Sequence, residues 1–331
     1  MNQNNDLDNQ NNDLDNQIND IFELDKIYPI DKSSLTISDK DIDIHKIYGT
    51  INIEKFKNLD TLFFFDNRDN LYLRPKCKFI NYPNHIEHIA FHNTNIDITN
   101  LPNSLIILST YNCGLTNIDM INLPLNLTKL YCCKNNITQL DNLPMGLKKL
   151  NCDDNNITQL DNLPIGLKKL DCSYNKITHL DLLPETLEYL VCSDNMILSL
   201  DNLPNGLVYL ECSYNLICKL NSLPDSLQQV FAKSNKIDSI SKLPKNLTRA
   251  NLTLNPLIST PKCANSLLLL NYSLDAEKAS STDKIIQSGY KIAYGSYHTA
   301  KYTTYGIGIG LLGIGMLALY PLLITYKKIK K

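Results

Sequence analysis

A proline recurs every 20 residues through the middle of the chain, and this repeat constrains the fold more than any other feature. The repeating prolines are Pro124, Pro144, Pro164, Pro184, Pro204, Pro224 and Pro244. Around them the sequence follows, with few exceptions, the pattern L-P-x-x-L-x-x-L-x-C-x-x-N-x-I-x-x-L, as at residues 143–160. A unit this short cannot bury its apolar side chains alone, so successive units are expected to stack and share one core.

Weaker copies of the unit flank the regular block. Upstream copies carry Thr94 and Cys113 at the asparagine position, and Leu270 and Tyr272 indicate a last, decayed copy. Such departures are expected at the ends of a stack, because terminal units cap it.

The apolar positions of the unit match the leucine-rich-repeat signature L-x-x-L-x-L-x-x-N/C-x-L, with cysteine in the third apolar position. The chain thereby resembles the short, bacterial-type leucine-rich repeats, which occur in secreted bacterial effectors and in repeat proteins of amoeba-infecting giant DNA viruses. Its asparagine- and lysine-rich composition and its cysteine position are more similar to the viral group. Effector relatives that are ubiquitin ligases carry a large catalytic domain after the repeats, whereas only residues 276–331 follow here, so the resemblance implies binding without that activity.

The unit predicts a leucine-rich-repeat solenoid whose short strands, one per unit, form a curved parallel β-sheet. Leucine and cysteine side chains are expected to point inward, and the residues between them outward on the concave side. The asparagine lies where the chain leaves the strand, so its amide can satisfy backbone groups of the turn. The convex side is expected to be extended or irregular with little helix, because proline disfavours helix in the residue before it.

Composition divides the chain into six segments. They are a disordered Asn/Asp-rich tail at 1–20, an N-terminal cap at 21–54, the solenoid at 55–275 with its regular block at 124–257, a linker at 276–302, a transmembrane helix at 303–326 and a basic tail at 327–331. The tail at 1–20 is predicted to be disordered because it has too little apolar surface to offset the entropy lost on ordering.

Residues 303–326 contain no charged side chain and are long enough as a helix to cross a hydrocarbon core of ~30 Å. The alternative, a buried core helix, would need a second protein layer that the repeats do not supply. Gly306, Gly310 and Gly313 are candidates for close helix packing and self-association in the membrane.

The orientation of this span is open to two interpretations. No signal peptide precedes the repeats, which favours a single-pass, tail-anchored protein with cytosolic repeats. The four lysines after the span favour the opposite orientation. The N-x-[ST] sequons give a usable readout of which side the repeats occupy.

Five cysteines share one inward position in successive units. They are Cys132, Cys152, Cys172, Cys192 and Cys212. We expect core thiols, because neighbouring strands lie ~4.8 Å apart whereas a disulfide needs Cβ atoms nearer ~3.8 Å, and because no close C-x-x-C pair indicates zinc. Cys133 is predicted to be the most exposed thiol, and neither a metal nor a cofactor is expected.

The residues expected to point outward form a candidate binding surface on the concave face. Its residues are Lys149, Lys169, Asp171, Tyr189, Val191, Tyr209, Glu211 and Phe231. Aromatic anchors flanked by charge are typical of protein interfaces, whereas the alternative is a solvated mixed-charge face. The net charge of −2 gives no indication of a nucleic-acid partner.

These observations predict a membrane-tethered scaffold that binds a protein partner and performs no catalysis. One alternative is a structural virion or membrane-organising protein that acts through its glycine-rich span. Another is a cysteine-dependent enzyme, for which His85, His88 and His92 with Cys77 and Cys113 are the candidate residues.

Overall fold

The computed structural model describes residues 21–23, 31–38, 49–65, 77–117, 122–240, 242–259 and 269–274. All of them belong to one compact unit that ends at Asp275. The tail at 1–20, the linker, the expected membrane span with Gly306, Gly310 and Gly313, and the basic tail lie outside these residues. Within the described ranges, no helix combines the length and apolar character needed to cross a membrane.

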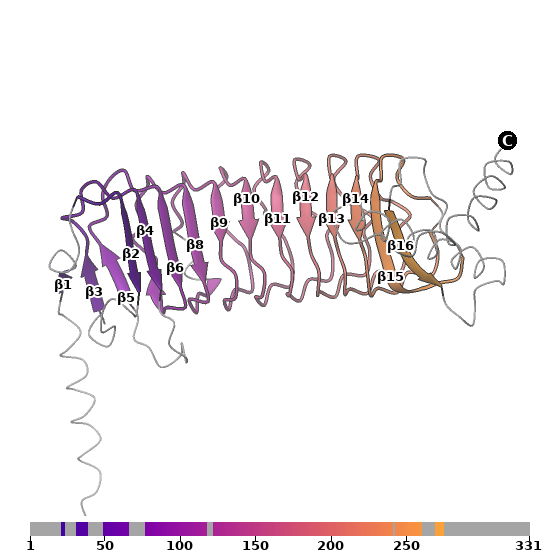
Figure 1. Cartoon of the computed structure of the whole chain (residues 1–331), viewed down its shortest axis with the longest axis horizontal. Helices are drawn as coiled ribbons and strands as arrows, with labels where there is room; N and C mark the ends of the chain where they lie inside the picture. The colour runs from indigo at the N-terminus through magenta and orange to yellow at the C-terminus, as the bar shows by residue number, and fades with distance from the viewer. Residues whose placement is uncertain are drawn as a thin grey trace, which may run out of the picture. The chain divides into compact units, whose positions relative to one another are not determined.

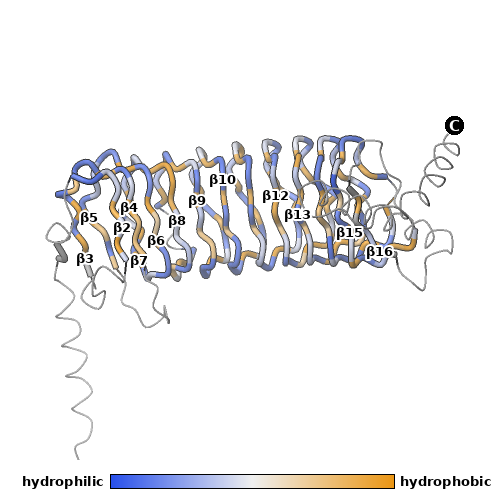
Figure 2. Tube along the Cα trace, viewed as in Figure 1, coloured by the Kyte–Doolittle hydropathy of each residue, from blue (hydrophilic) through white to orange (hydrophobic). Residues whose placement is uncertain are grey.

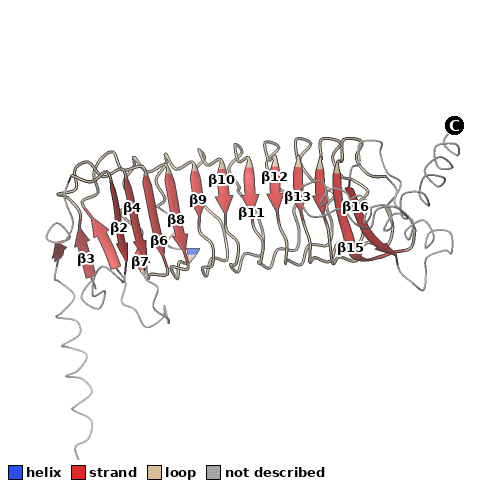
Figure 3. Cartoon of the chain, viewed as in Figure 1, coloured by secondary structure: helices blue, strands red, loops and turns tan. Residues whose placement is uncertain are grey.

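The described residues form β-strands joined by turns, and the strands lie side by side in a row (Figures 1 and 3). The larger sheet has twelve strands, all parallel, and follows chain order, as the 20-residue unit predicted. Its strands are β2 (Ser34–Ser38), β4 (Thr61–Phe65), β6 (His88–His92), β8 (Ile107–Tyr111), β9 (Lys129–Tyr131), β10 (Lys149–Asn151), β11 (Lys169–Asp171), β12 (Tyr189–Val191), β13 (Tyr209–Glu211), β14 (Gln229–Phe231), β15 (Arg249–Leu257) and β16 (Leu269–Leu274).

A second, four-stranded sheet accompanies the first units. Its strands are β1 (Ile21–Glu23), β3 (Gly49–Asn52), β5 (Cys77–Ile80) and β7 (Ile96–Asp97). The chain alternates between the two sheets there, because the first repeats are longer: Ser34 pairs with Thr61, and Thr61 pairs with His88. Repeats of that length have room for a second strand, whereas the 20-residue units make only turns on this side.

The core runs along the whole stack as repeated layers of apolar side chains. Figure 2 shows the apolar residues recurring along the backbone trace of the stack. In one unit Leu147, Leu150, Cys152 and Ile157 have no exposed surface. The first units use larger side chains instead, because their greater length leaves more space to fill. There Phe79 packs against Phe64 and Phe91, with ring centroids 5.4 Å apart in each pair.

A buried asparagine bonds each unit to the one before it. The side-chain amide of Asn155 donates to the carbonyl oxygens of Cys132 at 3.0 Å, Cys152 at 3.0 Å and Asp153 at 3.2 Å, and its Oδ1 accepts from the Ile137 N–H at 3.1 Å. The same set of bonds recurs at Asn175, Asn195, Asn215, Asn235 and Asn255. This asparagine ladder satisfies backbone groups that would otherwise be buried without partners.

Cys113 replaces the ladder asparagine in an early unit, as the signature allowed. Its thiol donates to the carbonyl oxygens of Phe91 at 3.1 Å and Tyr111 at 3.4 Å. Burial raises the pKa of this thiol to about 12, so it stays protonated and keeps its role as a donor.

We expect Asn175→Ala to lower the free energy of unfolding by roughly 3 kcal/mol or more, because it leaves several buried backbone groups without partners. Asn136→Ala is the matched control, since Asn136 is exposed in the neighbouring position of the unit. Urea unfolding measures both changes. Equal stability of the two variants would contradict a structural role for the ladder.

Candidate functional site

The parallel register places the candidate binding residues in two rows on the face of the large sheet that points away from the core, hereafter the outer face. Lys149, Lys169, Tyr189 and Tyr209 occupy equivalent positions on β10 to β13. Two residues later, Asp171, Val191, Glu211 and Phe231 occupy equivalent positions on β11 to β14. The structure therefore brings together all eight residues that the sequence predicted.

Three rings on this face contact one another, and we call Tyr189, Tyr209 and Phe231 the aromatic row. The Tyr189 and Tyr209 rings stack with centroids 6.0 Å apart and planes at 25°. The Tyr209 and Phe231 centroids lie 5.7 Å apart with planes at 42°. Tyr189 is 37% exposed, whereas Tyr209 and Phe231 are half-buried, so the row is partly accessible on the sheet surface.

Two lysines of the outer face lie on tyrosine rings. The Lys169 ammonium is 4.3 Å from the centroid of Tyr189, and the Lys149 ammonium is 4.9 Å from that of Tyr131. Such contacts are electrostatically favourable because the ring face is negative. They also hold the lysine side chains along the sheet.

The two carboxylates of the site accept hydrogen bonds from residues that follow the strands. Asp171 Oδ1 accepts from the Ser173 N–H at 3.2 Å, and Glu211 Oε1 accepts from the Ser193 hydroxyl at 3.0 Å. Burial raises the pKa of Asp171, although its hydrogen bonds with Ser173 oppose that shift. The Asp171 carboxylate is therefore less completely solvated than a free surface aspartate.

A second group of rings on the outer face was missed by the sequence analysis. Phe63 and Phe65 lie 6.1 Å apart by ring centroid, Phe65 lies 5.3 Å from His92, and His92 lies 5.9 Å from Tyr111. The signal was present, because Leu62 and Phe64 are the apolar core positions of β4 and strand alternation turns their neighbours outward. Burial lowers the pKa of His92, which also contacts the Ser109 hydroxyl at 3.1 Å.

Exposed tyrosines also lie at the edge of the outer face, in the position just before the ladder asparagine. This position has a positive φ in nine successive units: Asn93, Asn112, Lys134, Asp154, Tyr174, Asp194, Tyr214, Ser234 and Leu254. Tyr174 and Tyr214 have φ of 52° and 57° and are 59% and 47% exposed. Sequence pattern could not identify this conformation, since most of these residue types do not favour it.

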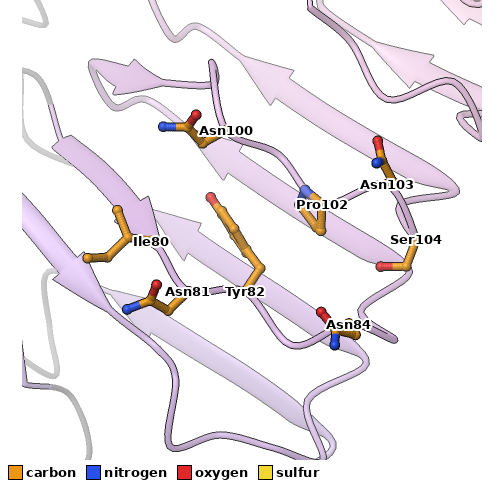
Figure 4. A pocket seen from close by; sticks show the side chains of 8 residues that line it. All are labelled: Ile80, Asn81, Tyr82, Asn84, Asn100, Pro102, Asn103 and Ser104. Atoms are coloured by element: carbon orange, nitrogen blue, oxygen red, sulfur yellow. The ribbon is translucent and has the colours of Figure 1, made fainter.

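A shallow pocket of about 460 Å³ lies away from the aromatic row, at the end of β5 (Figure 4). It is lined by Ile80, Asn81, Tyr82, Asn84, Asn100, Pro102, Asn103 and Ser104. None of these side chains is charged, and none is a cysteine or histidine that could act as a nucleophile or a general base. The pocket was not predicted, because it arises between loops of the irregular early units.

The histidines and cysteines proposed for an enzyme have other contacts. His85 Nε2 lies 3.6 Å from the Asp60 carboxylate, and the buried Cys113 thiol donates to backbone carbonyls. Within the part of the chain that the structure describes, no group of three or more His, Cys, Asp or Glu side chains is placed to hold a metal ion.

The cysteine row lies in the core, and the nine described cysteines are free thiols. The prediction for Cys133 was wrong, because it is 9% exposed and the exposed thiol is Cys218. The strand ends at Tyr131, so alternation no longer applies two residues later, and the Cys133 sulfur lies 3.8 Å from the Asn151 carbonyl oxygen. Ser173 and Ser213, at the same position, are also buried.

The parallel sheet, the short unit and the asparagine ladder together define a leucine-rich-repeat solenoid. YopM from Yersinia pestis, described as a leucine-rich effector protein, has a similar structure: TM-score 0.54, 25% identity, 73% of this chain and 75% of that one covered. YopM from Yersinia enterocolitica WA-314 is also similar, with a TM-score of 0.51 at 24% identity over 73% of this chain. The match covers 62% of that protein, so this chain spans less than two thirds of its length.

The functional domain of InlJ from Listeria monocytogenes, which includes a cysteine ladder, is also similar. Its TM-score is 0.50 at 25% identity, with 75% of this chain and 55% of that one covered. No protein-family model and no curated protein sequence matches the chain. The comparisons therefore support the fold and a leucine-rich-repeat protein.

We expect Cys218 to react first with a thiol reagent such as DTNB, because the other eight described cysteines are buried and burial raises the pKa of those in the row. The experiment uses a Cys263→Ser background, since Cys263 lies outside the described residues. Adding Cys218→Ser should abolish the fast phase at neutral pH, whereas adding Cys133→Ser should leave it intact. The reverse result would contradict the burial of Cys133.

Proposed function

We propose that the chain is a membrane-tethered scaffold that binds a protein partner on the outer face of its repeat sheet, without catalysis of its own. The observation that supports this most directly is the aromatic row, because three contacting rings lie at least partly exposed on a sheet surface. Aromatic side chains at the centre of a polar surface are the residues that most often dominate protein–protein affinity.

The support for binding comes from the arrangement of the row as well as its composition. The stacked rings hold one another in place, so little conformational entropy is lost when a partner covers them. Lys169 at one end and Glu211 beside the centre add charge at the border of the rings. An apolar centre with a charged border favours a specific partner over general adhesion.

The membrane part of the proposal rests on sequence. Residues 303–326 form an uncharged apolar stretch between Lys301 and Lys327. We propose that this stretch anchors the protein with its repeats in the cytosol, where free thiols persist. The cysteine position and composition, similar to those of giant-virus repeats, support a viral source.

We expect the double variant Tyr189→Ala/Tyr209→Ala to weaken partner binding by about tenfold or more, since truncation of a central aromatic anchor commonly costs about 2 kcal/mol. Quantitative proximity labelling in cells compares the partners of this variant with those of the original chain. Leu182→Ala/Leu198→Ala is the control, because both leucines are exposed outside the strands. An unchanged partner set would remove the aromatic row as the binding site.

We expect the repeats of the full chain, expressed with an N-terminal tag, to be digested when intact membrane vesicles are treated with protease, and to carry no glycan. Deletion of residues 303–331 should move the protein to the soluble fraction. Protection from protease, with a glycosidase-sensitive mass on sequons such as Asn136, would place the repeats on the other side of the membrane. A deleted chain that stays in the membrane would contradict the anchor.

A further inference from the structure

We propose that the partner is basic: an arginine of an extended protein segment lies over Val191, between the carboxylates of Asp171 and Glu211 and against the rings of Tyr189 and Tyr209. This inference rests on the proposed function, because it assigns the chemistry of the partner that the outer face binds. Asp171 and Glu211 would recognise the charge of the partner, whereas the rings would supply apolar contact.

The backbone register places a valine between two acidic residues on three adjacent strands, and we call these three positions the slot. Asp171, Val191 and Glu211 pair at the same position on β11, β12 and β13. Neighbouring strands lie ~4.8 Å apart, so the two acidic residues lie roughly 10 Å apart, with the apolar Val191 between them. A planar guanidinium fits such a space, because its N–H groups can reach a carboxylate on each side.

The aromatic row forms one side of the slot. Tyr189 and Tyr209 lie two residues before Val191 and Glu211 on the same strands, and therefore on the same face of the sheet. Burial raises the pKa of the Tyr209 hydroxyl, and the carboxylates of Glu211 and Asp171 raise it further, which indicates that both charges act at this ring. A cation bound there would be attracted by the two carboxylates and would contact the rims of the Tyr189 and Tyr209 rings, because Lys169 and the neighbouring rings cover their faces.

The lysines of the outer face already show that its tyrosines accept cations. Lys169 lies over Tyr189, and Lys233 lies 5.3 Å from the centroid of Tyr214. Within the described residues, neither Asp171 nor Glu211 lies within ion-pair distance of a lysine or arginine. The charge of Lys149 acts on Asp171 from further away and lowers the pKa of that carboxyl, against the larger effect of burial. An external cation that contacts both carboxylates directly would therefore add an interaction that the outer face does not itself supply.

Arginine fits this environment better than lysine. Its guanidinium is planar and donates in two directions at once, whereas an ammonium is a compact, strongly hydrated charge. The floor of the slot is apolar at Val191, and weakly hydrated cations tolerate such a surface better. The partner segment is expected to be extended, because the slot lies in the open surface of a sheet.

The competing explanation is that both carboxylates serve only the fold, since each accepts hydrogen bonds from neighbouring serines. Asp171→Asn/Glu211→Gln separates the two explanations, because the amides keep an oxygen acceptor in the same place and remove only the charge. Asp181→Asn/Glu185→Gln is the matched control, removing one aspartate and one glutamate charge from exposed turns.

The test measures fluorescence anisotropy of a labelled Gly/Ser peptide with arginine at alternate positions, titrated with the full chain in neutral detergent. The comparison peptide carries citrulline, which has the same shape without the charge. We expect saturable binding of the arginine peptide, about tenfold weaker binding of the citrulline peptide, and about tenfold loss in Asp171→Asn/Glu211→Gln but not in the control variant.

Equal binding of the two peptides, or unchanged affinity in Asp171→Asn/Glu211→Gln, would overturn the inference. If partner capture then still depends on Tyr189 and Tyr209, the proposed function stands and only the basic partner is wrong. Self-association that Asp171→Asn/Glu211→Gln abolishes, without peptide binding, would instead make the slot an interface between copies of this chain. Sedimentation velocity without peptide detects that outcome.

Discussion

The structure depends on one repeated polar interaction in an apolar core. Where each strand ends, the turn leaves backbone N–H and C=O groups buried, and the side chain of a single asparagine satisfies groups of its own unit and of the preceding one. A buried backbone group without a hydrogen-bond partner costs free energy. The asparagine bonds therefore determine both the length of the unit and its register with the neighbouring unit. The layers of leucine and cysteine then repeat at a fixed spacing, and every outward side chain has a defined neighbour.

Sequence periodicity was sufficient to predict the parallel sheet, the inward cysteine row and the asparagine position, because each follows from the repeat of one unit. Periodicity gave the wrong prediction for a side chain that lies just beyond the end of a short strand. Alternation of side chains holds only within a strand, and β9 to β14 have three residues each, so it does not extend to Cys133. The second sheet was missed for a different reason: the early repeats are long enough for another strand, but their spacing is irregular and conceals it.

The positions of the site residues could be predicted from the sequence, but their side-chain contacts could not. In-register pairing alone places Tyr189, Tyr209 and Phe231 on neighbouring strands, so their proximity followed from the sequence. Whether rings stack, and whether Lys169 lies on a ring or extends into solvent, depends on side-chain rotamers that spacing does not determine. Phe63 and Phe65 escaped notice because their unit departs from the consensus, although the same alternation rule applies to them.

In nine successive units, the residue just before the ladder asparagine, or before the residue that replaces it, has a positive φ, which is the left-handed backbone conformation. In that conformation most residues with a Cβ atom are strained by about 1 kcal/mol, and asparagine or glycine would be less strained than Tyr174, Tyr214 or Leu254. The ladder asparagine that follows keeps the same backbone bonds in successive units, although the side chain before it changes from unit to unit. The solenoid thus has a column of positions whose side chains differ while the core beneath them repeats.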